Sequence, residues 1–251
     1  MILCWYKMEI KEHIVQSSCC EYSRRVWLLN DDDETDQKLC VFLDAEYYLD
    51  HLHAQSVIGD LRRQDIIPPV TCVFVSHLDA EARHYDYACN DQYSGFIAHD
   101  VSRWAGVRVA GVSLSDSLIC GLSLSGLASA YLALKYPRIF SRALCQSGSF
   151  WWNHEWLVKN AGPDEGSRSR FWVSVGDKEA EAGISHPPTG LYQGVSQLAA
   201  STRMAETLSK ADISVNYHLF AGGHETGPWQ EELPSALAWL LGQEAEHSSA
   251  G

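Results

Sequence analysis

A serine between small residues lies where a predicted strand gives way to a predicted helix. The segment Ser117–Leu127 reads SLICGLSLSGL, with Gly121 two residues before Ser123 and Ser125 two residues after it. A serine on a sharp strand-to-helix turn takes a strained backbone conformation, and small neighbours let the strand and the helix approach. This arrangement is typical of a nucleophile elbow, whose serine attacks a carbonyl carbon. An ordinary strand-to-helix turn is the alternative.

A nucleophilic serine needs a histidine to accept its proton and a carboxylate to orient that histidine. Both follow here, in loops after predicted strands. His224 comes directly after a Gly-Gly pair that can swing it back over the sheet, so it is the expected base. Glu179 stands three residues after a loop glycine and is the expected acid, whereas Asp177 directly follows Gly176 and is expected to cap the turn. Asp177 remains the alternative acid.

The elements that must position these residues alternate between strand and helix. Such alternation predicts an α/β domain with a mostly parallel central sheet, helices on both faces and an antiparallel N-terminal hairpin at one edge. The charged run 30–36 is expected to form a solvated hairpin turn, and 186–190 a loop. The expected strands are 8–15, 22–29, 40–43, 70–75, 117–120, 143–145, 171–175 and 215–220, and the expected helices are 92–104, 126–136, 193–210 and one bearing Leu233, Leu237, Leu240 and Leu241.

Composition narrows the classes of function. The chain has 251 residues, 46% of them hydrophobic, and a net charge of −13. That composition can build a core, and one domain over 1–243 with a disordered tail at 244–251 is expected. The negative charge argues against nucleic acid and against anionic membrane surfaces as partners, and the sequence gives no oligomeric state.

The cysteines and the N-terminus point to a cytoplasmic protein. The eight cysteines lie mostly in apolar runs without a Cys-x-x-Cys pair, which is typical of buried thiols in a reduced compartment. No apolar signal region and no 18-residue apolar run is visible. His51 and His53 are half of a zinc site without further ligands, so neither a metal nor another cofactor is expected.

Several further motifs are spread over residues 39–242. They are Leu43-Asp44-Ala45, Arg83–Asp86, Asn90–Tyr93, Ile119–Leu127, Tyr136–Phe140, Gln146–Trp152 and Gly222–His224 followed by Trp229. Together they resemble the esterase family of α/β-hydrolases that includes the enterochelin (ferric enterobactin) esterases, in its short single-domain form. Two positions depart from that pattern, because Ala45 and Ser125 each stand where the family usually has glycine.

The resemblance implies roles for particular residues. It implies an α/β-hydrolase fold with Ser123 as nucleophile and His224 as base, and with the acid in the loop after residue 175. The oxyanion hole would consist of the backbone N–H groups of Leu124 and Ala45. Three side chains that bind the substrate would follow: Trp151 and Trp152 would wall an acyl pocket unless they fill the core, and Arg83 would meet a substrate oxygen unless it forms a structural ion pair.

The expected function is therefore a serine esterase acting on a small-molecule ester through an acyl-enzyme. Esters of catecholate siderophores are the more specific expectation, and a general carboxylesterase or a feruloyl-type esterase is the alternative. A protein of charge −13 repels an anionic iron-loaded substrate at long range unless local cations compensate. A non-catalytic binding protein on the same fold is the alternative from another class.

Overall fold

The computed structural model describes residues 10–30, 36–162 and 169–242. The central strands consist mostly of buried residues; β4, for example, reads VTCVFV and is buried throughout. Such strands suit a sheet that is covered on both faces. The strands are β1 (Ile10–Gln16), β2 (Ser23–Asn30), β3 (Gln37–Leu43), β4 (Val70–Val75), β5 (Val112–Leu122), β6 (Phe140–Gln146), β7 (Arg170–Gly176), β8 (Ile184–His186), β9 (Leu191–Gln193) and β10 (Ser214–Phe220).

Eight of the described strands form one twisted sheet in the order β1-β2-β4-β3-β5-β6-β7-β10. In that order, the strands from β4 to β10 run parallel to one another. The pairs β1–β2 and β2–β4 are antiparallel. The predicted parallel sheet with an antiparallel edge is thus confirmed. The fold is of the α/β-hydrolase type.

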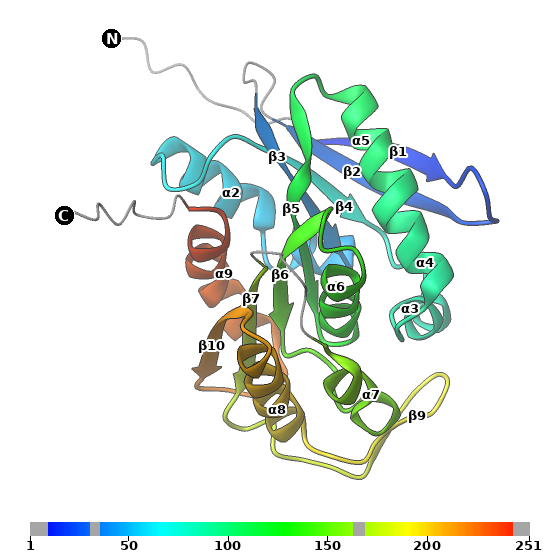
Figure 1. The fold of residues 1–251 in the computed structure, drawn as a ribbon, viewed down its shortest axis with the longest axis vertical. Helices are drawn as coiled ribbons and strands as arrows, with labels where there is room; N and C mark the ends of the chain where they lie inside the picture. The colour runs from blue at the N-terminus through cyan, green and yellow to red at the C-terminus, as the bar shows by residue number, and fades with distance from the viewer. Residues whose placement is uncertain (1–9, 31–35, 163–168, 243–251) are drawn as a thin grey trace.

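Helices cover both faces of the sheet (Figure 1). Two buried clusters result: one face packs against α4 to α6 and α8, and the other against α1, α2 and α9. The helical segments are α1 (Ala45–Asp50), α2 (Ala54–Arg63), α3 (Ala80–Asp86), α4 (Asp91–Gly95), the π-helical η1 (Phe96–Val101), α5 (Ser102–Arg108), α6 (Leu124–Lys135), α7 (Trp152–Asn160), α8 (Gln197–Lys210) and α9 (Thr226–Leu241).

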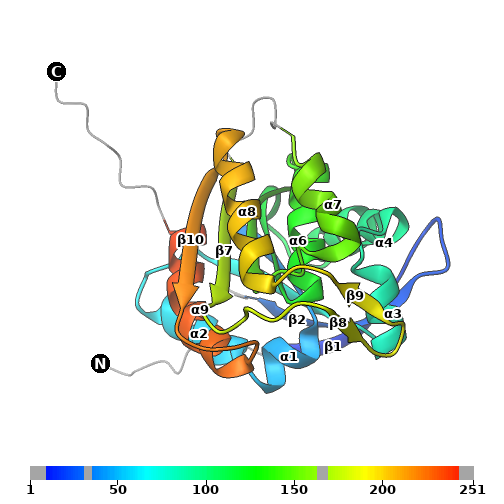
Figure 2. The same ribbon diagram turned by 90° about the horizontal axis from the view of Figure 1, so that it is seen from below.

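The carboxyl ends of the parallel strands meet at one edge of the sheet, where ligands bind in open α/β sheets. The residues that follow β3, β5, β7 and β10 therefore come together although they are far apart in sequence. Beside this edge, β8 and β9 pair as a separate antiparallel hairpin. Figure 2 shows that hairpin next to α3 and α7.

Several predictions about local structure were wrong. The run 30–36 does not join a hairpin, because β2 and β3 are both hydrogen-bonded to β4, which lies between them. The helix expected from 193 begins at Gln197, because 191–193 are in β9, whereas the loop predicted at 186–190 is present at 187–190 as the tip of the β8–β9 hairpin. Residues 31–35 and the predicted tail at 244–251 lie outside the described residues. None of the described helices has the length and apolarity that crossing a membrane requires.

Candidate active site

Ser123 occupies a strained turn between β5 and α6. Its φ of 54° and ψ of −121° place a non-glycine residue in a sparsely populated conformation. The Ser123 N–H donates to the Gln146 carbonyl at 2.8 Å, which ties the turn to the end of β6. A Cβ on Gly121 would lie 2.1 Å from the Ser125 carbonyl oxygen, so only glycine fits there. The strained strand-to-helix turn that the sequence predicted is present, and packing against neighbouring backbone maintains it.

Three side chains form a hydrogen-bonded chain from this turn. Ser123 Oγ lies 2.9 Å from His224 Nε2, and His224 Nδ1 lies 2.6 Å from Glu179 Oε2. The His224 ring packs edge-on against Trp229, with centroids 4.9 Å apart. The imidazole thus has one nitrogen toward a hydroxyl and the other toward a carboxylate, which is the geometry of base-assisted nucleophilic attack.

The Glu179 carboxylate is buried and held by further donors. Its Oε1 accepts from the Ser147 hydroxyl at 2.6 Å and from the Gly176 N–H at 2.8 Å. Ser147 in turn accepts from Trp229 Nε1 at 2.9 Å. Sequence reasoning did not single out Ser147, although it lies in the Gln146–Trp152 motif. It follows β6 as Glu179 follows β7, so the two loops meet beside the histidine.

Asp177 has a different partner. Its Oδ1 accepts from the Gly222 N–H at 2.9 Å, and its own N–H donates to the Phe220 carbonyl. The side chain therefore joins the loop after β7 to the loop after β10, which carries His224. Of the two acids left open by the sequence, Glu179 is the one that contacts the histidine.

The two expected oxyanion donors each begin a helix. Leu124 is the first residue of α6, and Ala45 is the first residue of α1. The N–H groups of a first helical turn have no partner within the helix, so they are free to bind an anion. Asp44 precedes Ala45 with a left-handed φ of 58°, which turns the chain sharply from β3 into α1. Ala45 itself is fully buried.

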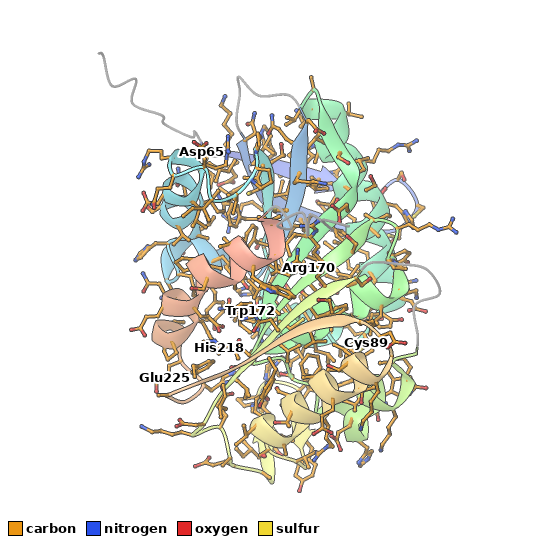
Figure 3. All side chains as sticks on the ribbon, turned by 60° about the vertical axis from the view of Figure 1, so that its left-hand side comes forward. Asp65, Cys89, Arg170, Trp172, His218 and Glu225 are labelled. Atoms are coloured by element: carbon orange, nitrogen blue, oxygen red, sulfur yellow. The ribbon has the colours of Figure 1, made fainter. Side chains whose placement is uncertain are left out.

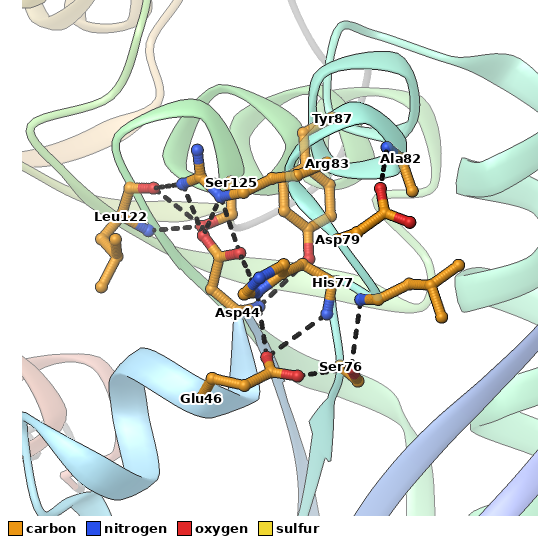
Figure 4. A network of polar contacts seen from close by, with 11 residues as sticks. Asp44, Glu46, Ser76, His77, Asp79, Ala82, Arg83, Tyr87, Leu122 and Ser125 are labelled. Atoms are coloured by element: carbon orange, nitrogen blue, oxygen red, sulfur yellow. Dashed lines mark hydrogen bonds and ion pairs between the residues drawn. The ribbon is translucent and has the colours of Figure 1, made fainter. Parts of the chain in front are cut away.

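Figure 4 shows how Asp44 holds this loop. The Arg83 guanidinium donates to both Asp44 oxygens at 2.6–3.0 Å, and the Ser125 hydroxyl lies 2.7 Å from Oδ2. His77 Nδ1 lies 3.3 Å from Asp44 Oδ1 and 3.0 Å from Glu46 Oε2. Burial opposes ionisation of Asp44, but the charge of Arg83 and the hydrogen bonds of its neighbours bring its pKa down to about 2. Arg83 therefore forms the structural ion pair that was the alternative to substrate binding.

A cavity of about 290 Å³ opens over Ser123. Trp151 lines it and stacks on His186, with centroids 5.1 Å apart and planes 15° apart. Arg83, His84 and Lys178 also line it. Trp152 does not, because it begins α7 and faces a neighbouring cavity that Trp151 also lines. The expectation that both tryptophans wall the acyl pocket over Ser123 was wrong for Trp152.

Another histidine–carboxylate pair lies away from Ser123. His218 Nδ1, on β10, is 2.7 Å from Glu232 Oε2, and Glu232 also accepts from the Ser174 hydroxyl. His218 packs edge-on against Trp172 of β7 (Figure 3). The hydrogen bond to Glu232 raises the pKa of His218. Among the described residues no three His, Cys, Asp or Glu side chains gather in a way that could hold a metal ion.

Curated enterobactin esterases are similar in sequence to most of this chain. The chain is 26% identical over 242 residues to the iron(III) enterobactin esterase of Dickeya dadantii, a match that covers 90% of this chain and 53% of that protein. The chain thus spans about half the length of the curated relatives it matches.

Solved structures share the fold. The enterobactin esterase of Shigella flexneri, crystallised in the presence of enterobactin, superposes with a TM-score of 0.80 at 24% identity, over 94% of this chain and 60% of that one. The same enzyme in the presence of 2,3-di-hydroxy-N-benzoyl-serine gives a TM-score of 0.78 at 24% identity, over 93% and 59% of the two chains.

A family profile extends the likeness to the elements that carry the site. The family described as "Putative esterase" matches residues 18–240, a stretch that runs from the turn after β1 into α9. Ser123, Glu179 and His224 all lie inside it. Since the match takes in nearly the whole sheet and every loop at its carboxyl edge, the chain belongs to this esterase family.

Proposed function

We propose that this chain is a serine esterase that hydrolyses carboxylic esters through an acyl-enzyme. The observation that carries the proposal is the chain of hydrogen bonds from Glu179 through His224 to Ser123, which lies at a strained turn. A hydroxyl alone is a weak nucleophile, and an adjacent imidazole oriented by a carboxylate activates it. Membership of the esterase family supports the same reaction.

The steps follow from the positions of the atoms. Ser123 Oγ attacks the ester carbonyl while His224 Nε2 takes the hydroxyl proton, and the carbonyl oxygen becomes an oxyanion. The N–H groups of Leu124 and Ala45 stabilise that oxyanion, each contributing about 3 kcal/mol. The C–O bond to the leaving alcohol then breaks as His224 returns the proton to it. Water, deprotonated by His224, attacks the acyl-enzyme and releases the acid and Ser123.

Aromatic acyl esters, catecholate esters among them, are the proposed substrate class. The stacked pair of Trp151 and His186 offers a flat wall for a ring. Lys178 supplies a cation on the same lining, to which Glu181 adds a carboxylate. The relatives are named as enterobactin esterases, which supports a catecholate ester.

We further propose that residues 1–243 act as one domain. We place the protein in a reducing, cytoplasmic compartment, as the buried free cysteines favour.

A hydrolysis screen tests the reaction and the substrate class separately. The purified chain is assayed with para-nitrophenyl acetate, methyl ferulate, and iron-free and ferric enterobactin, with Ser123→Ala as the control. Turnover of catecholate esters is expected. If the protein turned over only feruloyl or aliphatic esters, the proposed substrate class would be wrong and the proposed mechanism would stand. If the folded protein cleaved none of the esters, it would be a non-catalytic binding protein.

A further inference from the structure

Strand β10 ends the central sheet. In the described part of the chain it is hydrogen-bonded to β7 alone, and Figure 1 and Figure 2 both show it at the outer margin of the sheet. Its pairing with β7 runs from Ser214 to Phe220 without a bulge, so the edge is regular over its whole length. A regular edge presents a row of N–H and C=O groups to any strand that comes beside it.

The backbone groups of alternate β10 residues point away from β7. Along a strand, consecutive residues direct their N–H and C=O groups to opposite sides. The Ser214 N–H and the Phe220 carbonyl both form their hydrogen bonds on the side of β7. The outward-pointing residues between them are therefore Val215, Tyr217 and Leu219. Three N–H and three C=O groups are thus offered at this edge of the described sheet.

The sequence of β10 lacks the features that keep edge strands apart. The strand reads SVNYHLF and contains no Asp, Glu, Lys, Arg or Pro. In contrast, β1 at the other margin of the described sheet carries Lys11 and Glu12, which are both exposed. Charges, proline and bulges are the usual guards of edge strands against pairing with another chain. Their absence from β10, in a chain that is 20% charged, indicates an edge that pairs.

The side chains of the outward-pointing residues form an apolar row. The Tyr217 hydroxyl lies 2.8 Å from Thr202 of α8, so the row lies on the α8 face of the sheet. Leu219, in the same row, is 51% exposed. Beside the row lies a depression of about 480 Å³, in which the opposite charges of Glu206 and Lys210 balance. An apolar strand placed against this row gains hydrophobic contact and meets no net charge.

The order of residues along the row is symmetric about Tyr217. If two copies of β10 lie antiparallel with this residue opposite itself, Val215 lies opposite Leu219, and Asn216 lies opposite His218. Apolar residues then face apolar residues, and polar residues face polar residues. Each outward-pointing residue exchanges both of its hydrogen bonds with the residue opposite, which gives about six bonds between the copies. A typical protein interface has about 5–15, so this edge supplies what an interface needs.

We infer that β10 is the interface of a two-fold symmetric dimer, in which two copies of this chain pair their β10 strands antiparallel and join their sheets into one. Dimers with a two-fold axis are the commonest oligomers, and each copy contributes the same surface. The net charge of −13 does not prevent the contact, because β10 is uncharged and distant charges are screened beyond about 8 Å at physiological ionic strength. No residue of β10 lines the cavity over Ser123, so the inference is independent of the proposed function.

Sedimentation velocity of the purified chain tests for the dimer. Short interfaces of this kind bind weakly, so the protein is measured from about 5 to about 200 µM, where wild type should shift to twice the mass of one chain. Tyr217→Lys brings two like charges face to face at the axis, and Tyr217→Glu does the same with the opposite sign. Each variant alone should raise the Kd of the dimer at least about tenfold.

A mixture of the two variants tests the register. In an equimolar mixture of Tyr217→Lys and Tyr217→Glu, opposite charges meet at the axis, so a mixed dimer should form with a Kd within about threefold of wild type. Circular dichroism checks that each variant is folded. A mixture that associates no better than either variant alone would overturn the inference.

Ile14→Lys is the matched control, because Ile14 is an apolar residue of β1, at the other margin of the described sheet, and is 65% exposed. This variant should dimerise like wild type. The inference is wrong if wild type is a monomer at 200 µM, or if both single variants of Tyr217 dimerise like wild type. It is also wrong if Ile14→Lys dissociates the dimer and Tyr217→Lys does not, since the copies would then meet at β1.

Discussion

The Ser125 hydroxyl lies 2.7 Å from the Asp44 carboxylate, although the two residues are 81 positions apart. This contact joins the turn that carries Ser123 to the loop that carries Ala45. Ser125 also accepts from the Leu122 N–H at 2.8 Å, so it bonds both to its own turn and to the opposite loop. The serine that replaces the usual glycine of the motif therefore links the nucleophile to the proposed oxyanion donor.

Replacing Ser125 by alanine should weaken both stability and activity. The substitution leaves a buried N–H and a buried carboxylate each without one partner, which costs about 1–3 kcal/mol, and Tm should fall by roughly 3–10 °C. We expect kcat to fall about tenfold, because Ala45 loses the anchor of its neighbour Asp44. Thermal denaturation and steady-state kinetics measure the two effects.

Ser129→Ala is the control for this substitution. Ser129 is a buried serine of the same helix, and within the described part of the chain its hydroxyl has no hydrogen-bond partner. Loss of the Ser129 hydroxyl should lower neither the stability of the protein nor kcat. Equal effects of the two substitutions would mean that burial alone, and not the contact with Asp44, accounts for the change.

Ser123→Ala and His224→Ala should each lower kcat by about 10⁴- to 10⁶-fold while Tm stays within a few degrees of wild type. Both side chains lie at loop positions where their role is chemical. His218→Ala should retain most activity, because His218 pairs with Glu232 and not with Ser123.

A fluorophosphonate should label Ser123, as mass spectrometry of the tryptic peptide can show. Labelling of Ser125 would contradict the assignment of Ser123 as the nucleophile.

Local patterns predicted the fold well because each depends on residues close in sequence. The run 70–75 is apolar and β-branched, and it is β4 with the same bounds. The turn at Ser123 was visible because a glycine and a small residue must flank it. In contrast, the β8–β9 hairpin is only three residues long on each side, too short for a periodic signal.

The parts of the site that sequence did not predict depend on contacts between distant residues. Ser147 reaches Glu179 only because β6 and β7 are neighbours in the sheet. Trp152 was expected at the cavity over Ser123 but lines the neighbouring one, and left-handed backbone at residues 153–155 directly follows it. The sequence allowed two roles for Arg83, because only the fold brings Asp44 beside it. Tertiary packing decided each of these cases.

Replacing each of the two acids near His224 by its amide should distinguish their roles. Glu179→Gln removes the charge that stabilises the imidazolium and should lower kcat by about 10³- to 10⁴-fold. Asp177→Asn keeps an oxygen that can accept from the Gly222 N–H, so it should cost about 1 kcal/mol of stability and little activity. Kinetics of the purified, folded variants decide the matter, and the reverse ranking would assign the acid role to Asp177.

Ser147 is expected to act as a positioning residue for Glu179. Ser147→Ala removes a donor to the carboxylate and leaves Trp229 Nε1 without its acceptor, so kcat should fall about tenfold while KM stays constant. Ser174→Ala is the control, because Ser174 is an equally buried serine whose hydroxyl donates to Glu232 instead. A change in KM alone, or equal losses of kcat in both variants, would argue against a positioning role.

The His77 imidazolium beside Asp44 and Glu46 should make stability depend on pH. Its close contacts with the carboxylates of Asp44 and Glu46 raise the pKa of His77 to about 9, from 6.5 for a free histidine. A group whose pKa is higher in the folded state binds its proton more tightly there, so its stabilising effect is complete below pH 6.5 and is lost as the pH rises through 9.

The variant His77→Gln has no such proton to lose. We therefore expect the Tm difference between wild type and His77→Gln to be largest at pH 6 and to shrink steadily towards pH 9.5 in thermal denaturation experiments. A difference that is the same at both ends of this range would mean that His77 is neutral in the folded protein and that Arg83 and Ser125 alone balance the Asp44 charge.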